Sequence, residues 1–113
     1  MIFDPPYIAV VFTSTRSSVD EGYGDMSDHM VELVNEVDGF LGMDSVRGAD
    51  GRGITVGYFR DDEALKTWRE NVEHRTAMQL GREKWYDEYS LHVTRVERSY
   101  NWLRESELRA RSS

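Results

Sequence analysis

The order in which strand-like and helix-like patterns follow one another constrains the fold of this chain more than any other feature. Runs rich in β-branched and aromatic residues predict strands, and apolar residues spaced three or four apart predict amphipathic helices. Strands are expected at residues 7–14, 40–47, 54–59 and 89–96, and helices at 18–37 and 61–71, with the helical pattern resuming over 75–84. This β-α-β-β-α-β order is typical of the ferredoxin-like α+β arrangement, with two helices on one face of a four-stranded antiparallel sheet.

The first strand indicates that the other face of this sheet is covered as well. Ile8, Val10 and Phe12 alternate with Ala9 and Val11, so apolar side chains point to both faces. Because two helices cover only one face, a symmetric partner is the simplest cover for the second. We therefore expect a homodimer whose two sheets face each other.

Local signals predict where elements begin and end. Ser18 and Glu21 stand at capping-box spacing, which predicts that the first helix begins at Ser18, and Gly39 is expected to stop it. The Gly- and Asp-rich residues 48–53 are typical of a hairpin turn. Residues 1–100 are expected to form one domain, and residues 101–113 a charged tail that is either a short helix or disordered.

Charge and composition exclude several classes of function. The net charge is −7 and no basic cluster offsets it, so binding to nucleic acid or to an anionic membrane is not expected. The chain has no Cys, which excludes thiol chemistry and Cys-ligated metals and fits a reducing cytoplasm. The three His are not at a compact ligand spacing, so no metal site is expected.

The N-terminal residues do not resemble a targeting segment. They lack a basic region, and Pro5 and Pro6 interrupt the apolar run, so a signal peptide is not expected. No stretch approaches the roughly 18–20 apolar residues that a membrane span needs. These observations lead us to expect a cytoplasmic protein.

Large aromatic side chains gather around one histidine between residues 57 and 86. Trp68 lies on the apolar stripe of the helix expected at 61–71, His74 follows it, and Trp85 and Tyr86 precede the last strand. The spacing of Trp68 and His74 is roughly two-thirds of a turn more than one full turn, so they share a face only if the helix breaks near Asn71. Such a grouping can line an apolar pocket that holds one titratable group.

Two interpretations of these residues remain open. Trp68 can be simple core and His74 a partly exposed residue at a helix end. In the functional interpretation Trp68 is a wall against a planar substrate and His74 is a general base. Tyr58 and Phe59 point to opposite faces, so one faces the helices and the other the partner. The further candidates for contact with a substrate are Met30, Tyr58, Phe59, Met78, Trp85 and Tyr86.

Several short segments together resemble the antibiotic biosynthesis monooxygenase family, whose members are dimeric α+β barrels. The segments are Gly39-Phe40-Leu41-Gly42, Tyr58-Phe59-Arg60, Trp68, Glu73-His74 and Gly81-Arg82-Glu83-Lys84-Trp85-Tyr86. The resemblance implies a pocket between each sheet and its own helices. It also implies that a phenolic substrate can be deprotonated and oxidised by O2 without flavin, metal or haem.

The chain departs from two patterns within that family. Haem-degrading relatives pair the helix Trp with a His ten residues on and use an Asn on the first strand, whereas this chain has Met78 there and no Asn in residues 7–14. Quinone-forming relatives place a Tyr where His74 stands. The resemblance therefore favours a cofactor-independent oxygenase of a small phenolic molecule. A haem-binding or haem-degrading relative and a non-enzymatic ligand-binding dimer are the alternatives.

Overall fold

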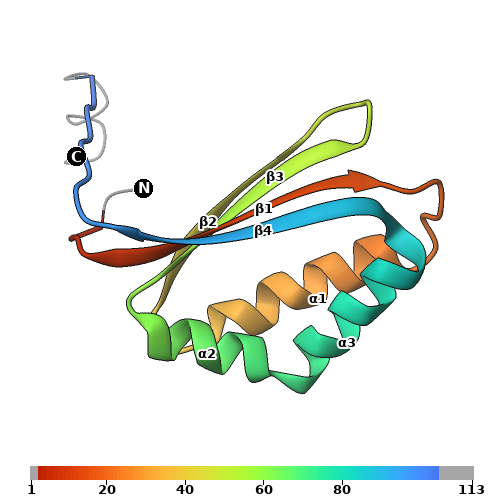
Figure 1. Ribbon diagram of the computed structural model, residues 1–113, viewed down its shortest axis with the longest axis horizontal. Helices are drawn as coiled ribbons and strands as arrows, with labels where there is room; N and C mark the ends of the chain where they lie inside the picture. The colour runs from red at the N-terminus through yellow and green to blue at the C-terminus, as the bar shows by residue number, and fades with distance from the viewer. Residues whose placement is uncertain (1–2, 105–113) are drawn as a thin grey trace, which may run out of the picture.

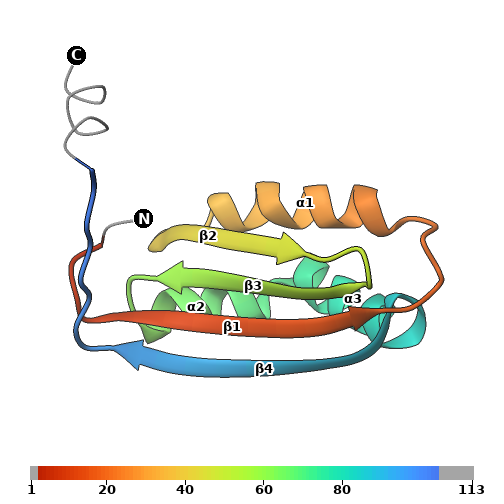
Figure 2. The same cartoon turned by 90° about the horizontal axis from the view of Figure 1, so that it is seen from above.

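The computed structural model describes residues 3–104, and they form a four-stranded antiparallel sheet with helices on one face (Figure 1). The strands lie in the order β2-β3-β1-β4. Figure 2 shows α1 at the β2 side of the sheet and α2 and α3 beneath its middle. The elements are β1 (Tyr7–Arg16), α1 (Tyr23–Asn35), β2 (Phe40–Arg47), β3 (Arg52–Phe59), α2 (Asp62–Glu70), α3 (Val72–Leu80), the π-helical turn η1 (Gly81–Trp85) and β4 (Tyr86–Val96). The ferredoxin-like arrangement predicted from the sequence is confirmed, with its second helix divided into α2 and α3.

The register of the sheet sorts its side chains between the two faces. Ile8 pairs with Phe59, and both belong to the buried core beneath the sheet, together with Val34 of α1 and Leu65 of α2. Phe59 is 2% exposed, the lowest value in this cluster together with Ala64. The core is therefore concentrated at the end of the sheet where α2 begins.

A single extended residue, Asn71, separates α2 from α3. Its backbone angles are φ −61° and ψ 124°, and its side-chain oxygen accepts a hydrogen bond from the His74 backbone N–H at 3.0 Å. Asn is among the residues that best cap a helix N-terminus, because its short side chain satisfies an otherwise unpaired amide. The sequence predicts that the second helix ends at Asn71 and that the helical pattern resumes at Arg75, but α3 begins at Val72.

The predicted start of the first helix at Ser18 is wrong. The helix begins at Tyr23, after Gly22 in the left-handed region at φ 79°. The preceding residues bond elsewhere: the Ser17 N–H and the Arg16 Nε–H both donate to the Trp85 carbonyl, at 2.8 Å and 3.0 Å. These tertiary bonds hold the segment out of the helix, in competition with a local capping box.

The last strand begins at Tyr86 and not at residue 89. Its first residues pair with the end of β1, where Glu88 lies opposite Thr15 and Tyr86 opposite Arg16 across a register shift. The adjacent polar residues Asp87 and Glu88 interrupt the run of β-branched and aromatic residues that predicts a strand. The hairpin predicted between β2 and β3 is confirmed, and Gly51 occupies its left-handed position at φ 87°.

The sheet face opposite the helices is open toward the hairpin, whereas Tyr7 and Ala9 at its other end are 7% and 5% exposed. It carries Val11, Val46, Ile54 and Val56, of which Val46 is 76% and Ile54 is 53% exposed. After β4 the chain runs away from the sheet on this same side (Figure 1), with Tyr100 and Trp102 exposed. Residues 105–113 of the predicted tail lie outside the described residues. Within residues 3–104, none of the helices has the length and apolar character that crossing a membrane requires.

Candidate functional site

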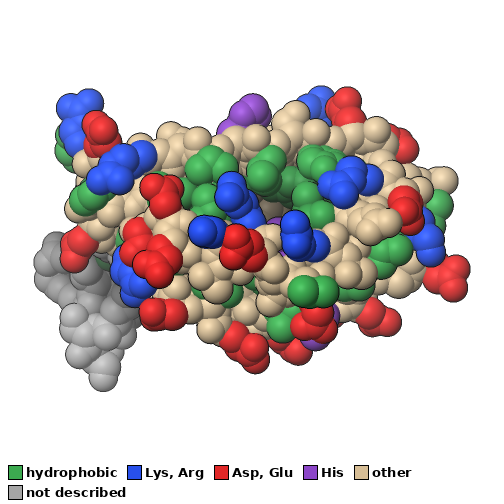
Figure 3. All heavy atoms as spheres, turned by 60° about the horizontal axis from the view of Figure 1, so that its bottom comes forward, with side chains coloured by type: hydrophobic (Ala, Val, Ile, Leu, Met, Phe, Trp, Pro, Cys, Tyr) green, Lys and Arg blue, Asp and Glu red, His purple; other side chains and the backbone are tan. Residues whose placement is uncertain are grey.

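A cavity of about 420 Å³ lies between the sheet and its helices. Its floor is the helix-facing side of the strands, including Val10, Met43, Thr55 and Gly57. In Figure 3 hydrophobic side chains gather in a hollow on this side of the molecule, with Lys and Arg side chains beside it. Leu91 and Val93 of β4 also line the cavity, yet they are 47% and 50% exposed. The cavity is therefore open along the β4 edge.

Trp68 and His74 stack on each other in the wall of this cavity. Their ring centroids are 4.2 Å apart and the ring planes are inclined by 22°. The break at Asn71 makes this contact possible, because it turns α3 so that His74 returns to the face of α2 that carries Trp68. The indole face against His74 is not available to a ligand, so a substrate can contact only the rest of the Trp68 ring.

Burial lowers the pKa of His74 from its ordinary value of 6.5, and the backbone of Trp68 acts in the opposite direction to a lesser extent. Desolvation has this sign because it disfavours the charged imidazolium. The ring sits in the first turn of α3, where the positive end of the helix dipole also disfavours a positive charge. His74 is therefore neutral near pH 7 and can accept a proton.

Tyrosine and tryptophan side chains form the opposite end of the cavity. Trp85 is 5% exposed, and its indole N–H donates to the Glu21 carbonyl at 3.0 Å. Tyr23 of α1 meets Trp85 edge-on, with ring centroids 5.9 Å apart. Burial raises the pKa of the Tyr86 hydroxyl, as does its interaction with Tyr23. The Tyr86 hydroxyl thus keeps its proton near neutral pH and can exchange hydrogen bonds with a ligand.

Arg47, which is not among the residues predicted from the sequence, lines this same end of the cavity. Its side chain donates hydrogen bonds to the Ser14 hydroxyl at 2.8 Å and to the Gly51 carbonyl at 2.6 Å. A signal was present, because Met43, Ser45 and Arg47 share one parity of β2 and therefore one face. The apolar Met43 on that face indicated that Arg47 points to the helix side.

The predicted site residues come together in the cavity with one exception. Trp68, His74, Phe59, Met30, Met78, Trp85 and Tyr86 all line it. Tyr58 does not, because its register partner is Ala9 on the open face, whereas Phe59 pairs with Ile8 of the core. The Tyr58 hydroxyl donates to Asp44 at 3.0 Å, and burial together with that carboxylate raises the pKa of Tyr58. Tyr58 is therefore removed from the candidate site.

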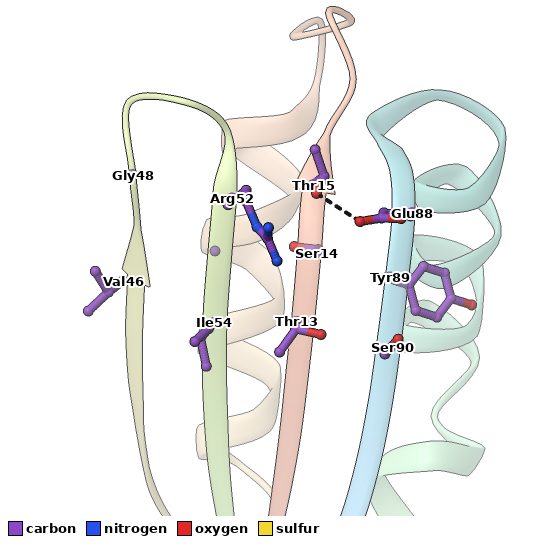
Figure 4. Close-up of a pocket in the computed structure, with 11 residues that line it drawn as sticks. Thr13, Ser14, Thr15, Val46, Gly48, Arg52, Ile54, Glu88, Tyr89 and Ser90 are labelled. Carbon is purple, nitrogen blue, oxygen red and sulfur yellow. Dashed lines mark hydrogen bonds between the residues drawn. The ribbon is translucent and has the colours of Figure 1, made fainter.

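A second cavity, of about 440 Å³, lies toward the hairpin end of the sheet (Figure 4). Thr13, Val46, Arg52 and Ile54 line it, and a weak hydrogen bond of 3.4 Å joins Thr15 to Glu88 at one side. These residues lie on the open face, where a partner chain is expected. The cavity between sheet and helices is the better candidate, because it combines aromatic walls with a neutral base.

Metal ligation finds little support in the described part of the chain. Within residues 3–104, no group of three or more His, Cys, Asp or Glu side chains is arranged to hold a metal ion. His29 is engaged with Glu73, with 3.0 Å between its Nε2 and the carboxylate. The side chains that line the cavity offer proton transfer at His74 and aromatic stacking.

The fold and this cavity define a ferredoxin-like α+β protein with an aromatic pocket between sheet and helices. Residues 6–80 match the family model described as antibiotic biosynthesis monooxygenase, and the chain belongs to that family. It is 47% identical over 95 residues to "Uncharacterized protein YqjZ" of Bacillus subtilis (strain 168), a match that covers 84% of this chain and 83% of the relative.

Solved structures share the fold at low sequence identity. SnoaB, described as a cofactor-independent oxygenase from Streptomyces nogalater, superposes with a TM-score of 0.71 at 9% identity, over 84% of this chain and 97% of its own. Rv0793 from Mycobacterium tuberculosis superposes with a TM-score of 0.72 at 15% identity, over 84% of this chain and 99% of its own. These matches agree with the arrangement of the sheet and helices and carry no information on substrate.

Proposed function

We propose that this protein is a cofactor-independent monooxygenase that oxidises a small phenolic molecule with O2. The observation that carries the proposal is the stack of neutral His74 on Trp68 inside an aromatic cavity. Family membership supports it, and so does SnoaB, which has the same fold and is described as a cofactor-independent oxygenase.

In the proposed mechanism His74 accepts the phenolic proton of the bound substrate. The resulting phenolate is electron-rich enough to reduce O2 directly when the ring carries an adjacent CH2 group. O2 adds at that carbon, and loss of water from the hydroperoxide converts CH2 to C=O. One oxygen atom enters the product and the other leaves as water, with all four electrons supplied by the substrate.

Trp68 has two roles in this proposal. Its indole contacts the planar substrate, and its stacked face stabilises the imidazolium that forms when His74 takes the proton. Phe59, Met30 and Met78 supply apolar contacts that exclude water from the substrate ring. Trp85 and Tyr86 close the far end.

The first test is O2 uptake with a panel of reduced polycyclic phenols, using protein free of flavin, haem and metal. His74→Ala is expected to lower turnover about ten- to a hundredfold, the usual contribution of a positioned general base. His92→Ala is the matched control, because His92 lies opposite Val11 on the other face of the sheet and does not line the cavity. Equal turnover in His74→Ala and the wild type would remove His74 from the mechanism.

Two other outcomes would redirect the assignment. Binding of aromatic ligands with no O2 uptake would favour a ligand-binding protein of this fold. An intense Soret band on titration with hemin, saturating at one haem per chain, would favour a haem-binding relative. Met78 stands where the haem-degrading pattern has its His, so we do not expect that band.

We further propose that two copies pair through their open sheet faces. The support is the exposure of Val46 and Ile54 on a face that no helix covers within residues 3–104. A cytoplasmic location is proposed as well, on the absence of Cys from the sequence.

A further inference from the structure

The candidate cavity has a cationic group at the end away from the main apolar core. Arg47, Gly53 and Ser14 lie in one row across β2, β3 and β1, because Gly53 pairs with both of the others. The Arg47 side chain lies across Gly53, where a Cβ atom would come within 2.6 Å of the guanidinium carbon. The absence of a side chain at Gly53 thus leaves room for the guanidinium to lie flat on the sheet.

Arg47 is fixed in place without being neutralised. One terminal nitrogen donates to the Ser14 hydroxyl and the other to the Gly51 carbonyl, and both acceptors are uncharged. Arg16 and Arg60, by contrast, form ion pairs with Asp20 and Asp61 at 3.0 Å and 3.1 Å. Within residues 3–104 no carboxylate lies within salt-bridge distance of Arg47. A guanidinium has five N–H donors, so Arg47 retains donors for a ligand.

The distance along the cavity suits an elongated ligand. Met43, which packs against the core cluster as Trp68 does, lies four residues before Arg47 on β2. Four residues of extended chain span about 13 Å, which exceeds one benzene ring and suits two or three fused rings. The floor between the two ends carries the small residues Ser45, Thr55 and Gly57.

We propose that the cavity selects aromatic acids, whose carboxylate Arg47 binds while the ring system extends toward Trp68 and His74. The proposal rests on the proposed function, since it names the substrate class of the same pocket. A carboxylate matches the planar fork of a guanidinium and can accept two parallel hydrogen bonds from it. Tyr86, which also lines this end, adds a hydroxyl that can donate to the same group.

The test compares two ligands of the same ring size, 2-naphthoate and 2-naphthol, by isothermal titration calorimetry at neutral pH. The wild type is expected to bind 2-naphthoate about tenfold more tightly than 2-naphthol. Arg47→Gln should weaken 2-naphthoate binding by about tenfold and change 2-naphthol binding less than about twofold, because hydrogen bonds to a charged group are lost. Arg47→Lys keeps the positive charge but not the planar guanidinium, so its affinity for 2-naphthoate should lie between those of the wild type and Arg47→Gln.

Arg75→Gln provides the matched control. Arg75 is exposed on α3 and does not line the cavity, so the same change of charge there should leave both affinities unchanged. Arg47 is itself exposed, and the preference for 2-naphthoate should therefore weaken as ionic strength rises. Thermal unfolding of each variant shows whether the loss of the Gly51 and Ser14 bonds has altered the fold.

The outcomes separate this proposal from the one on which it rests. Binding of 2-naphthol without a preference for 2-naphthoate in the wild type would overturn the anion site and leave the aromatic pocket intact. An equal loss of affinity for both ligands in Arg47→Gln would also overturn the anion site, because Arg47 would then support only the fold. Failure of the wild type to bind either ligand would overturn both proposals.

Discussion

At the scale of single residues, the environment of His74 predicts how the protein responds to pH. Burial lowers the pKa of His74 below 6.5, so the neutral form that accepts a proton predominates near pH 7. O2 uptake is expected to be constant above neutral pH and to fall through that lowered pKa as the solution is acidified. A profile that falls with a midpoint above 6.5 would contradict this assignment.

The same shift predicts a change in stability. Between the lowered pKa and 6.5 the unfolded chain binds a proton that the folded chain does not, so the free energy of unfolding rises with pH across this window. Stability is lost as pH falls through it. We expect the free energy of unfolding, measured by urea titration, to differ less between about pH 7.5 and about pH 5 in His74→Gln than in the wild type.

At the scale of elements, Asn71 connects helix geometry to the site. Its side chain caps α3, and the break that it forms places His74 on Trp68. Asn71→Ala is expected to lower the free energy of unfolding by about 1 kcal/mol, the usual effect of losing such a cap, as measured by urea titration. Because the start of α3 positions His74, turnover should fall as well.

A conservative variant distinguishes capping from a general loss of structure. Asp also accepts a hydrogen bond at a helix N-terminus, so Asn71→Asp should retain stability and most of the turnover. Wild-type stability in Asn71→Ala would show that the cap contributes nothing to α3. Reduced turnover in both variants at unchanged stability would point to a direct contact of Asn71 with the substrate.

At the scale of the whole molecule, the open sheet face predicts assembly. A charge placed on Ile54, which is 53% exposed on that face, should prevent two sheets from pairing, because an unpaired carboxylate is costly to bury. Ile54→Asp is therefore expected to sediment with half the mass of the wild type in analytical ultracentrifugation. Val72→Asp is the matched control, since Val72 is 73% exposed in the first turn of α3. A wild-type monomer at micromolar concentration would remove the dimer proposal.

The sequence by itself determined the order of elements and pointed to most of the predicted residues that line the cavity. Runs of β-branched and aromatic residues and the helical stripes were strong enough to predict the ferredoxin-like sheet, and the second helix was predicted to end at Asn71, where α2 and α3 are divided. Those features depend on local periodicity and capping, which act over a few residues. Phe59, Trp85 and Tyr86 were identified for the same reason, as large aromatics at the ends of predicted elements.

Only the tertiary structure decided the features that depend on pairing between distant segments. The start of α1 depends on bonds from Ser17 and Arg16 to other segments, and the pairing of β4 with β1 sets where that strand begins. Register placed Tyr58 on the open face and Arg47 in the cavity, because one step along a strand reverses the side of the sheet. The two-residue period of a strand makes its side chains alternate between the faces of the sheet. It does not say which face contacts the helices, because that depends on how the sheet and helices pack together.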